Sequence, residues 1–404
     1  MNQQSVNKSE AFALTVSRRS FLSLWCDSNP QGKNPSRELC DILVVCDPDV
    51  IIISVKEVQY QSDKEPCLAS ARWEREAIDA SVKQIYGAER WLAQAPRIVR
   101  KDGSQSLRLP PLENRHVHRI AVAIGGKGET IIKSGDFGKG YVHVVTERGF
   151  EDLLTELDTI TDLVGFLTSK EAYFNAGSKT LVIGPENNIL GYYLLNDKQF
   201  PADVDLLMID NTLWKGLAER EEYKRKKEAD KISYHWDRLI ELYVGPNREL
   251  LGEPDEQLTG MERALRAMAR EDRVSRRMLA STMRDFVEQA IDCRLRSRTI
   301  CGESGVIYVL IFFDPAEDRQ RRVAVLNDRI GLARHTVAKG NTVIGIGFLQ
   351  YESDAVAVCE LAYLDATDWS MEDDERAESL KAKRNFEARM TCRSLTAWEY
   401  PPTE

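Results

Sequence analysis

The chain has 404 residues, which is too many for one average domain and enough for two or three. Its apolar fraction of 43% and its charged fraction of 29% are ordinary for a globular protein, so a sizeable core can form. A net charge of −9 excludes a chain that is basic over its whole surface, although it allows a local basic groove. No stretch reaches the roughly 18 apolar residues that a membrane helix needs, so no membrane partner is expected.

The cysteines argue against a zinc site and against a disulfide framework. None of the eight belongs to a CxxC pair, and none lies beside a histidine at zinc-ligand spacing. Cys40 and Cys46 lie within an apolar run and are expected to be buried as small hydrophobic residues. A reduced, cytoplasmic protein is therefore predicted. The first ten residues are polar, carry no apolar signal core and are expected to be loose.

A β-hairpin is predicted after residue 38. The runs Leu39–Cys46 and Val50–Val58 are rich in β-branched and apolar residues, and only Asp47, Pro48 and Asp49 separate them. Two such runs joined by a turn of this composition are typical of antiparallel strands.

Helical segments flank this hairpin. The partly apolar run Phe12–Trp25 precedes it. After it, apolar residues from Ala71 to Gln94 recur mostly at spacings of three or four, which predicts a helix that Pro96 ends. The first hundred residues therefore have the order αββα.

The middle of the chain predicts a second α/β domain over residues 111–215. The expected strands are Val117–Ile124, Gly140–Val145, Thr180–Ile183 and Ile189–Leu195, and the expected helix is Asp152–Phe166. Residues 216–257 are expected to be a charged helical linker, because both signs of charge alternate from Glu219 to Lys231.

Residues 258–404 predict a C-terminal α+β domain. One long amphipathic helix is expected from Met261 to Ala290, and a charged helix from Asp365 to Arg389. Strands are expected at Val306–Phe313, Val323–Asn327, Thr342–Gln350 and Ala355–Tyr363.

Charged residues within the predicted hairpin suggest a catalytic or ligand-binding site. Asp41 lies near the start of the first strand, while Ser54 and Lys56 lie two residues apart on the second and so share one face. A lysine and an aspartate among valines and isoleucines are costly unless they pair with one another or bind a ligand. Carboxylates that hold Mg²⁺ beside a phosphate, with a lysine nearby, are suited to phosphodiester hydrolysis. An edge ion pair is the structural alternative.

The order Glu38…Asp41…Ser54-Val-Lys56, followed by a helix that carries Gln84, resembles the PD-(D/E)xK nuclease superfamily. The resemblance covers about residues 12–95. It implies a restriction-endonuclease-like αββα core with a mixed sheet over residues 1–110, followed by further α/β or α+β domains. It also implies that Glu38 and Asp41 bind Mg²⁺ or Mn²⁺, that Lys56 is the catalytic lysine, and that Gln84, or else Lys83, is the helix residue.

One residue departs from this pattern. Ser54 stands where the superfamily has an acid, and a serine hydroxyl is a poor metal ligand. Either Glu38 supplies the missing carboxylate beside Asp41 and Ser54, or the site is weakened. The expected function is therefore a metal-dependent endonuclease that cleaves DNA rather than RNA, with a resemblance to proteins of phage defence and mobile elements. The alternative is a degenerate nuclease fold that acts as a binding or assembly module. The oligomeric state and any need for a partner subunit stay open.

Two further groups of residues could bind a ligand. His116 and His118 share strand parity and could bind a metal, but no third ligand is in evident reach, and a surface pair is favoured. Several arginines from Arg263 to Arg284 share a helix face and could contact phosphates, but pairing with acids of the same helix is slightly favoured.

Overall fold

The computed structural model describes residues 8–32, 38–95, 97–127, 134–175, 179–182, 186–202, 206–251, 255–292, 295–337, 340–350, 356–383, 393–394 and 398–401. The chain is of mixed α/β class and divides into two compact units, Met1–Lys224 and Arg225–Glu404. Within the described parts of the chain, every helix is too short or too polar to cross a membrane.

The first unit is built on a six-stranded mixed sheet with the strand order β1-β2-β3-β6-β8-β7. Its strands are β1 (Cys26–Ser28), β2 (Ile42–Cys46), β3 (Asp49–Glu57), β6 (His116–Ile124), β7 (Gly135–Asp136) and β8 (Tyr141–Thr146). Strands β2 and β3 form the predicted antiparallel hairpin, with Ile42 opposite Ile53. Strand β6 runs parallel to β3 along its whole length and β8 runs parallel to β6. One sheet therefore crosses the domain boundary expected near residue 110.

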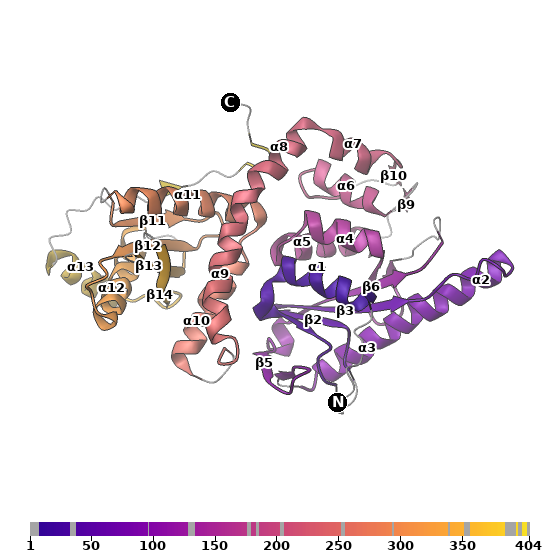
Figure 1. Cartoon of the computed structure of the whole chain (residues 1–404), viewed down its shortest axis with the longest axis horizontal. Helices are drawn as coiled ribbons and strands as arrows, with labels where there is room; N and C mark the ends of the chain where they lie inside the picture. The colour runs from indigo at the N-terminus through magenta and orange to yellow at the C-terminus, as the bar shows by residue number, and fades with distance from the viewer. Residues whose placement is uncertain are drawn as a thin grey trace. The chain divides into compact units, whose positions relative to one another are not determined.

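Helices cover both faces of this sheet (Figure 1). On one face lie α1 (Lys8–Trp25) and α4 (Glu147–Glu156), and on the other the helical stretch of α2 (Pro66–Trp73), the π-helical turn η1 (Glu74–Asp79) and α3 (Ala80–Leu92). The predicted helix at Ala71–Gln94 is confirmed and begins earlier, because Pro66 occupies its first turn and Glu65 accepts the Leu68 N–H at 3.0 Å. Residues 8–10 belong to α1, so the expectation of a loose segment there was wrong.

The remaining elements of the first unit lie outside the six-stranded sheet and the helices named above. They are β4 (Arg97–Val99), β5 (Gln105–Arg108), η2 (Leu112–Asn114), α5 (Ile160–Asn175), β9 (Lys179–Val182), α6 (Asn187–Leu195), β10 (Leu206–Ile209), α7 (Leu213–Glu219) and α8 (Glu221–Asp230), the last of which extends into the second unit. The single helix predicted at Asp152–Phe166 is two helices, because the Thr159 hydroxyl accepts the Asp162 N–H and starts α5. The strand predicted at Ile189–Leu195 is wrong, because these residues form α6.

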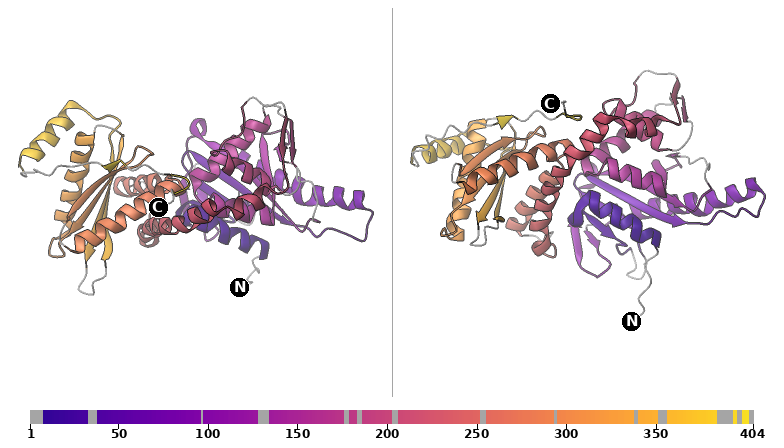
Figure 2. Two further views of the ribbon diagram at one scale, coloured as in Figure 1. Left: turned by 90° about the horizontal axis from the view of Figure 1, so that it is seen from above. Right: turned by 45° about the horizontal axis from the view of Figure 1, so that its top comes forward.

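The second unit carries a five-stranded mixed sheet with the order β14-β13-β12-β11-β15. Its elements are η3 (Lys231–Ser233), α9 (Tyr234–Asn247), α10 (Glu256–Ala269), α11 (Arg273–Ile291), β11 (Ser297–Cys301), β12 (Ile307–Phe313), α12 (Arg319–Val337), β13 (Thr342–Gln350), β14 (Val356–Asp365), α13 (Met371–Lys383) and β15 (Arg393–Ser394). Helix α12 joins the parallel strands β12 and β13. Helices lie on both sides of this sheet (Figure 2).

Three predictions for this part of the chain need correction. The helix expected at Met261–Ala290 is two helices, because the Asp272 carboxylate accepts the Ser275 N–H at 2.7 Å and starts α11. The strand expected at Val323–Asn327 lies inside α12. The charged linker at 216–257 contains α8 and α9, and α9 packs against α11 within the unit. Part of the helix expected to Arg389 lies outside the described residues.

The described cysteines are of two kinds. Cys26, Cys40, Cys46, Cys67 and Cys359 are thiols that are not disulfide-bonded, and the first three of these are buried. Cys301 is disulfide-bonded, which differs from the expectation of a fully reduced chain.

Candidate active site

Asp41 lies where the ladder between β2 and β3 ends. Strand β2 begins at Ile42, which pairs with Ile53, so Val55 on β3 has passed the last paired residue. The Val55 backbone N–H donates instead to the Asp41 carboxylate at 2.6 Å. Asp41 is 4% exposed. Its side chain therefore replaces a ladder hydrogen bond and leaves a charged oxygen at the open end of the hairpin.

Lys56 reaches the same carboxylate. Its ammonium nitrogen lies 3.8 Å from the Asp41 Oδ2 atom, and its side chain is 33% exposed. The structure thus brings together the two residues that the sequence placed on one face of the hairpin. The pair is open to solvent on the lysine side, so a ligand can approach this amine.

Ser54 and Gln84 form a separate contact between β3 and α3. Ser54 is fully buried, and its hydroxyl donates to the Gln84 Oε1 atom at 3.0 Å. Two residues that the sequence assigned to the site therefore meet, but they satisfy one another. This contact fixes the position of β3 two residues before Lys56.

Glu38 lies nearer the surface. Its side chain is 46% exposed, and its Oε1 atom lies 3.7 Å from the Lys101 ammonium. Its carboxylate still acts on the site, because it is one of the charges that raise the pKa of Glu10. Glu38 therefore belongs to the rim of the site.

Glu10 is the site residue that the sequence did not reveal. It lies in the first turn of α1 and is partly buried. Burial raises the pKa of its carboxyl group, and the carboxylates of Asp41 and Glu38 raise it further. A hydrogen bond with the Asn29 side chain and the charge of Lys56 act in the opposite direction. Its position in the sequence gave only a weak signal of function, because acids are common in the first turn of a helix, where they interact favourably with the helix dipole.

These residues fit an ion that takes few protein ligands. Asp41 lies beside Lys56, and its charge raises the pKa of the Glu10 carboxyl group, so the two carboxylates act on one another. Among the residues that the structure describes, no three His, Cys, Asp or Glu side chains form a metal cage. Mg²⁺ is commonly held by one or two carboxylates together with water and substrate phosphates, so this donor set suits it and does not suit zinc.

The histidines form a different cluster, at the opposite end of β3. The Asp49 carboxylate lies 3.1 Å from the buried His118 and 3.5 Å from the exposed His116. His143 is fully buried, and burial lowers the pKa of its imidazole, which is therefore neutral at pH 7. The Asp49 carboxylate provides the polar partner that the buried His118 needs. Within the described part of the chain, His116 and His118 do not belong to a group of three residues that could hold a metal ion.

The arginine-rich helix of the second unit does not present its central arginines to solvent. Arg273 and Arg276 are buried and bind the two carboxylate oxygens of Asp237 at 2.9 and 2.6 Å. Arg277 binds Asp230 at 2.7 Å. These carboxylate partners come from other helices. Both expectations for these three arginines, contact with phosphates and pairing within the same helix, were therefore wrong. Pairing within the helix does occur at Arg284, with Glu288 at 3.9 Å.

Comparison with known proteins gives no further guide to this site. No family model, no curated protein and no solved structure matches the chain.

Proposed function

We propose that the chain is a metal-dependent nuclease with a restriction-endonuclease-like core, and that it hydrolyses phosphodiester bonds in nucleic acid, with DNA as the favoured substrate. The observation that carries this proposal is the contact between Asp41 and Lys56 at the open end of one hairpin, where the charge of Asp41 also raises the pKa of Glu10 on α1. The order of helix, antiparallel hairpin, helix and parallel strand within a single mixed sheet supports the proposed core.

Asp41 and Glu10 would hold Mg²⁺ or Mn²⁺, with Glu38 at the rim. When bound, such an ion lowers the pKa of a water molecule and polarises a phosphate oxygen. Asp41 keeps its place because the Val55 N–H fixes one of its oxygens. Glu10 must be deprotonated to bind a cation, and its raised pKa therefore makes binding depend on pH.

Lys56 would stabilise the reacting phosphate. Its amine lies next to Asp41 and is accessible from solvent, so it can donate hydrogen bonds to a phosphate oxygen or to the attacking water. Ser54 and Gln84 are positioning residues in this account, since their mutual hydrogen bond orients the strand that carries Lys56.

A second candidate function is a binding or assembly module that keeps the fold without hydrolysis. One observation favours it, namely that Ser54 is buried and turned to Gln84 where the superfamily has a metal-binding acid. Such a module would bind nucleic acid in the presence of Mn²⁺ and leave it intact.

A cleavage assay separates the two functions. Plasmid DNA and matched DNA and RNA oligonucleotides are incubated with Mn²⁺ and with the wild type, Lys56→Met or Asp41→Asn. Lys56→Met keeps the aliphatic stem and Asp41→Asn keeps an acceptor for the Val55 N–H, so both should fold. We expect each substitution to lower the rate about 100-fold or more.

Lys64→Met is the matched control, because Lys64 is an exposed lysine of the same unit, and its rate should equal that of the wild type. Equal cleavage by all four proteins would indicate a contaminant and contradict the site. Binding of an oligonucleotide by the wild type without any cleavage would favour the module.

A further inference from the structure

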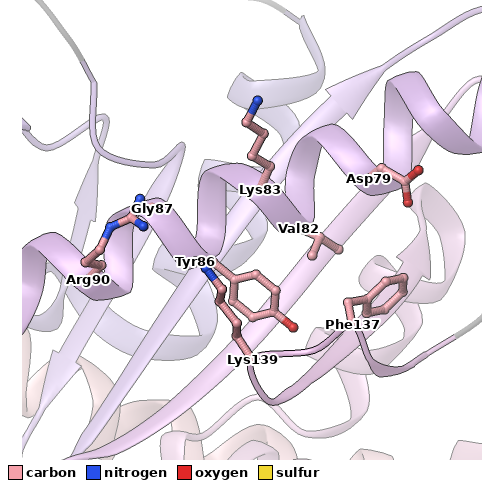
Figure 3. Close-up of a pocket in the computed structure, with 8 residues that line it drawn as sticks. All are labelled: Asp79, Val82, Lys83, Tyr86, Gly87, Arg90, Phe137 and Lys139. Carbon is pink, nitrogen blue, oxygen red and sulfur yellow. The ribbon is translucent and has the colours of Figure 1, made fainter.

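A second concave site lies on the first unit, between α3 and the loop that joins β7 to β8. It has a volume of about 400 Å³. The helix contributes residues at successive turns and the loop contributes two more, as Figure 3 shows. The lining residues are Asp79, Val82, Lys83, Tyr86, Gly87, Arg90, Phe137 and Lys139.

Three cations in this pocket lack a carboxylate partner. Lys83, Arg90 and Lys139 are exposed, and none of them forms an ion pair within the described ranges of the chain. The neighbouring basic residues differ, since Arg72 is paired with Glu76 and Arg119 with Glu89. The pocket therefore concentrates positive charge on a chain whose net charge is −9.

Aromatic side chains form the middle of the pocket. Tyr86 and Phe137 both line it, and Phe137 is 37% exposed although it is large and apolar. Rings that lie open to solvent beside unpaired cations are the surface on which nucleic-acid bases stack.

The acid of the pocket lies away from Arg90. Asp79 precedes Arg90 by eleven residues, which is about 16 Å along a helix axis. A carboxylate at this distance does not compete for a phosphate held by Arg90 and Lys139. It can instead accept a hydrogen bond from the amino group of a base that lies on the rings.

The wall formed by the loop is rigid. The Asp136 carboxylate accepts the N–H groups of Gly138 at 2.6 Å and Gly140 at 3.0 Å, and both glycines have a positive φ. The Tyr86 hydroxyl donates to the Gly140 carbonyl oxygen at 2.6 Å and so ties the loop to α3. Lys139 and Phe137 are thus presented from a turn that needs no reordering to receive a ligand.

We infer that this pocket binds one nucleotide unit, with the phosphate on Arg90 and Lys139 and the base on Tyr86 and Phe137. The unit could be a free mononucleotide or part of a strand, because the chemistry is the same for both. The register of the sheet sets Gly140 about six residues from the level of Lys56, or roughly 20 Å along the strands, so the end of the pocket formed by the loop lies apart from the active site. The other end reaches Lys83, the neighbour of Gln84 on the helix.

Gly87 allows a test that leaves the fold intact. A Cβ atom added at Gly87 meets no atom within 4 Å, so a larger side chain there can extend from the helix into the pocket. Gly87→Leu should fold, since it replaces a glycine inside a helix by a good helix former. Gly331→Leu is the control, because Gly331 also lies inside a helix with open space around it and belongs to the other unit.

Binding to the full chain is measured by titration in EDTA, with a purine nucleoside 5′-monophosphate, a single-stranded octanucleotide and inorganic phosphate as probes. We expect the nucleotide or the oligonucleotide to bind, and Gly87→Leu and Lys139→Gln to weaken binding about tenfold or more. Gly331→Leu should bind as the wild type does. If the substitutions weaken the binding of both the mononucleotide and the octanucleotide, the site is assigned to free nucleotides. If they weaken the binding of the octanucleotide alone, the site is assigned to a strand.

The inference is overturned if neither nucleotide probe binds, if both pocket variants bind like the wild type, or if phosphate alone binds as tightly as the nucleotide. Because the metal is chelated, these outcomes do not depend on cleavage. Asp41→Asn should leave this binding unchanged, so failure of the proposed active site and failure of the pocket are distinguishable.

Discussion

The two units each hold a cluster of buried or half-buried charges, and the clusters differ in how completely the charges are paired. In the second unit, the two oxygens of Asp237 bind Arg273 and Arg276, while those of Asp230 bind Arg277 and Lys226. Every one of these carboxylate oxygens has a cationic partner of its own, so the network can take up no further ligand.

In the first unit, the pairing is looser: Asp41 pairs with Lys56, which is a third exposed, and the surface residue Glu38 pairs with Lys101. Asp41 and Glu38 raise the pKa of Glu10, and Lys56 only partly offsets them. An excess of negative charge in a partly buried cluster lowers the stability of the fold, and a bound cation would offset it. This difference is the one expected if the first cluster receives the proposed ligand and the second stabilises the fold.

Removal of Asp237 should produce the largest effect. Asp237→Ala leaves two guanidinium groups buried without their carboxylate, so we expect the free energy of unfolding to fall by about 3–5 kcal/mol. Denaturant unfolding of the full chain measures this. Asp285→Ala is the control, because its partner Arg284 is exposed and the loss should stay within about 0.5 kcal/mol. A loss below about 1 kcal/mol for Asp237→Ala would contradict the structural role of the network.

Placing an acid at position 54 should produce an intermediate effect. In Ser54→Asp the Gln84 amide can turn and donate its NH₂ group to the new carboxylate, so the contact with α3 is kept. A further carboxylate beside Asp41 should tighten Mn²⁺ binding roughly tenfold, or about 1.4 kcal/mol. Calorimetric titration checks this, and unchanged or weaker binding by a folded variant would show that position 54 does not face the metal.

Glu10→Gln should have opposite effects on binding and on stability. Because the folded-state pKa of Glu10 is raised, its contribution to stability is present below the ordinary glutamate pKa and is lost as pH rises through the raised value. At pH 7 the metal-free variant should therefore be more stable than the wild type, by a few tenths of a kcal/mol because solvent screens this partly exposed group, while binding Mn²⁺ more weakly. Thermal unfolding in EDTA measures the first effect. A destabilised variant would indicate that Glu10 is an ordinary structural residue.

The smallest effect on stability is expected for substitution of His335, which links α12 to α13. Both nitrogens of His335 face carboxylates, Asp374 at 2.8 Å and Glu378 at 2.9 Å, and these hydrogen bonds raise the pKa of the imidazole. The stabilisation is complete below the ordinary histidine pKa and is lost as pH rises through the raised value. His335→Gln should cost a few tenths to about 1 kcal/mol in acid, since the partners are about half exposed, and less in alkali. A cost that does not change with pH would rule out a charged His335.

The hairpin could be predicted from the sequence because its signals are local. Its β-branched runs and the turn between them fix the two strands, and the period of two then places Asp41 and Lys56 on one face. Glu10 could not be predicted in this way. It comes before the first apolar residue of α1, and only the packing of that helix brings it to Asp41 from 31 positions away in the chain.

The errors in the fold have similar causes. A short apolar run such as Ile189–Leu195 fits a buried strand or a buried helix equally well, and tertiary packing decides between them. The breaks at Thr159 and Asp272 depend on single capping side chains inside otherwise continuous helical patterns. The pocket beside α3 combines the helix with a loop some 50 residues later, which no local pattern reveals.

The central claim, that the cluster of Asp41, Glu10 and Lys56 is built to receive a metal ion, is tested most directly by calorimetric titration of Mn²⁺ into the full chain. We predict that the wild type binds Mn²⁺ and that Asp41→Asn binds it at least about tenfold more weakly. Asp49→Asn, which changes a buried aspartate paired with His118 at the other end of β3, should bind like the wild type. No binding by the wild type, or equal binding by the wild type and Asp41→Asn, would contradict the account.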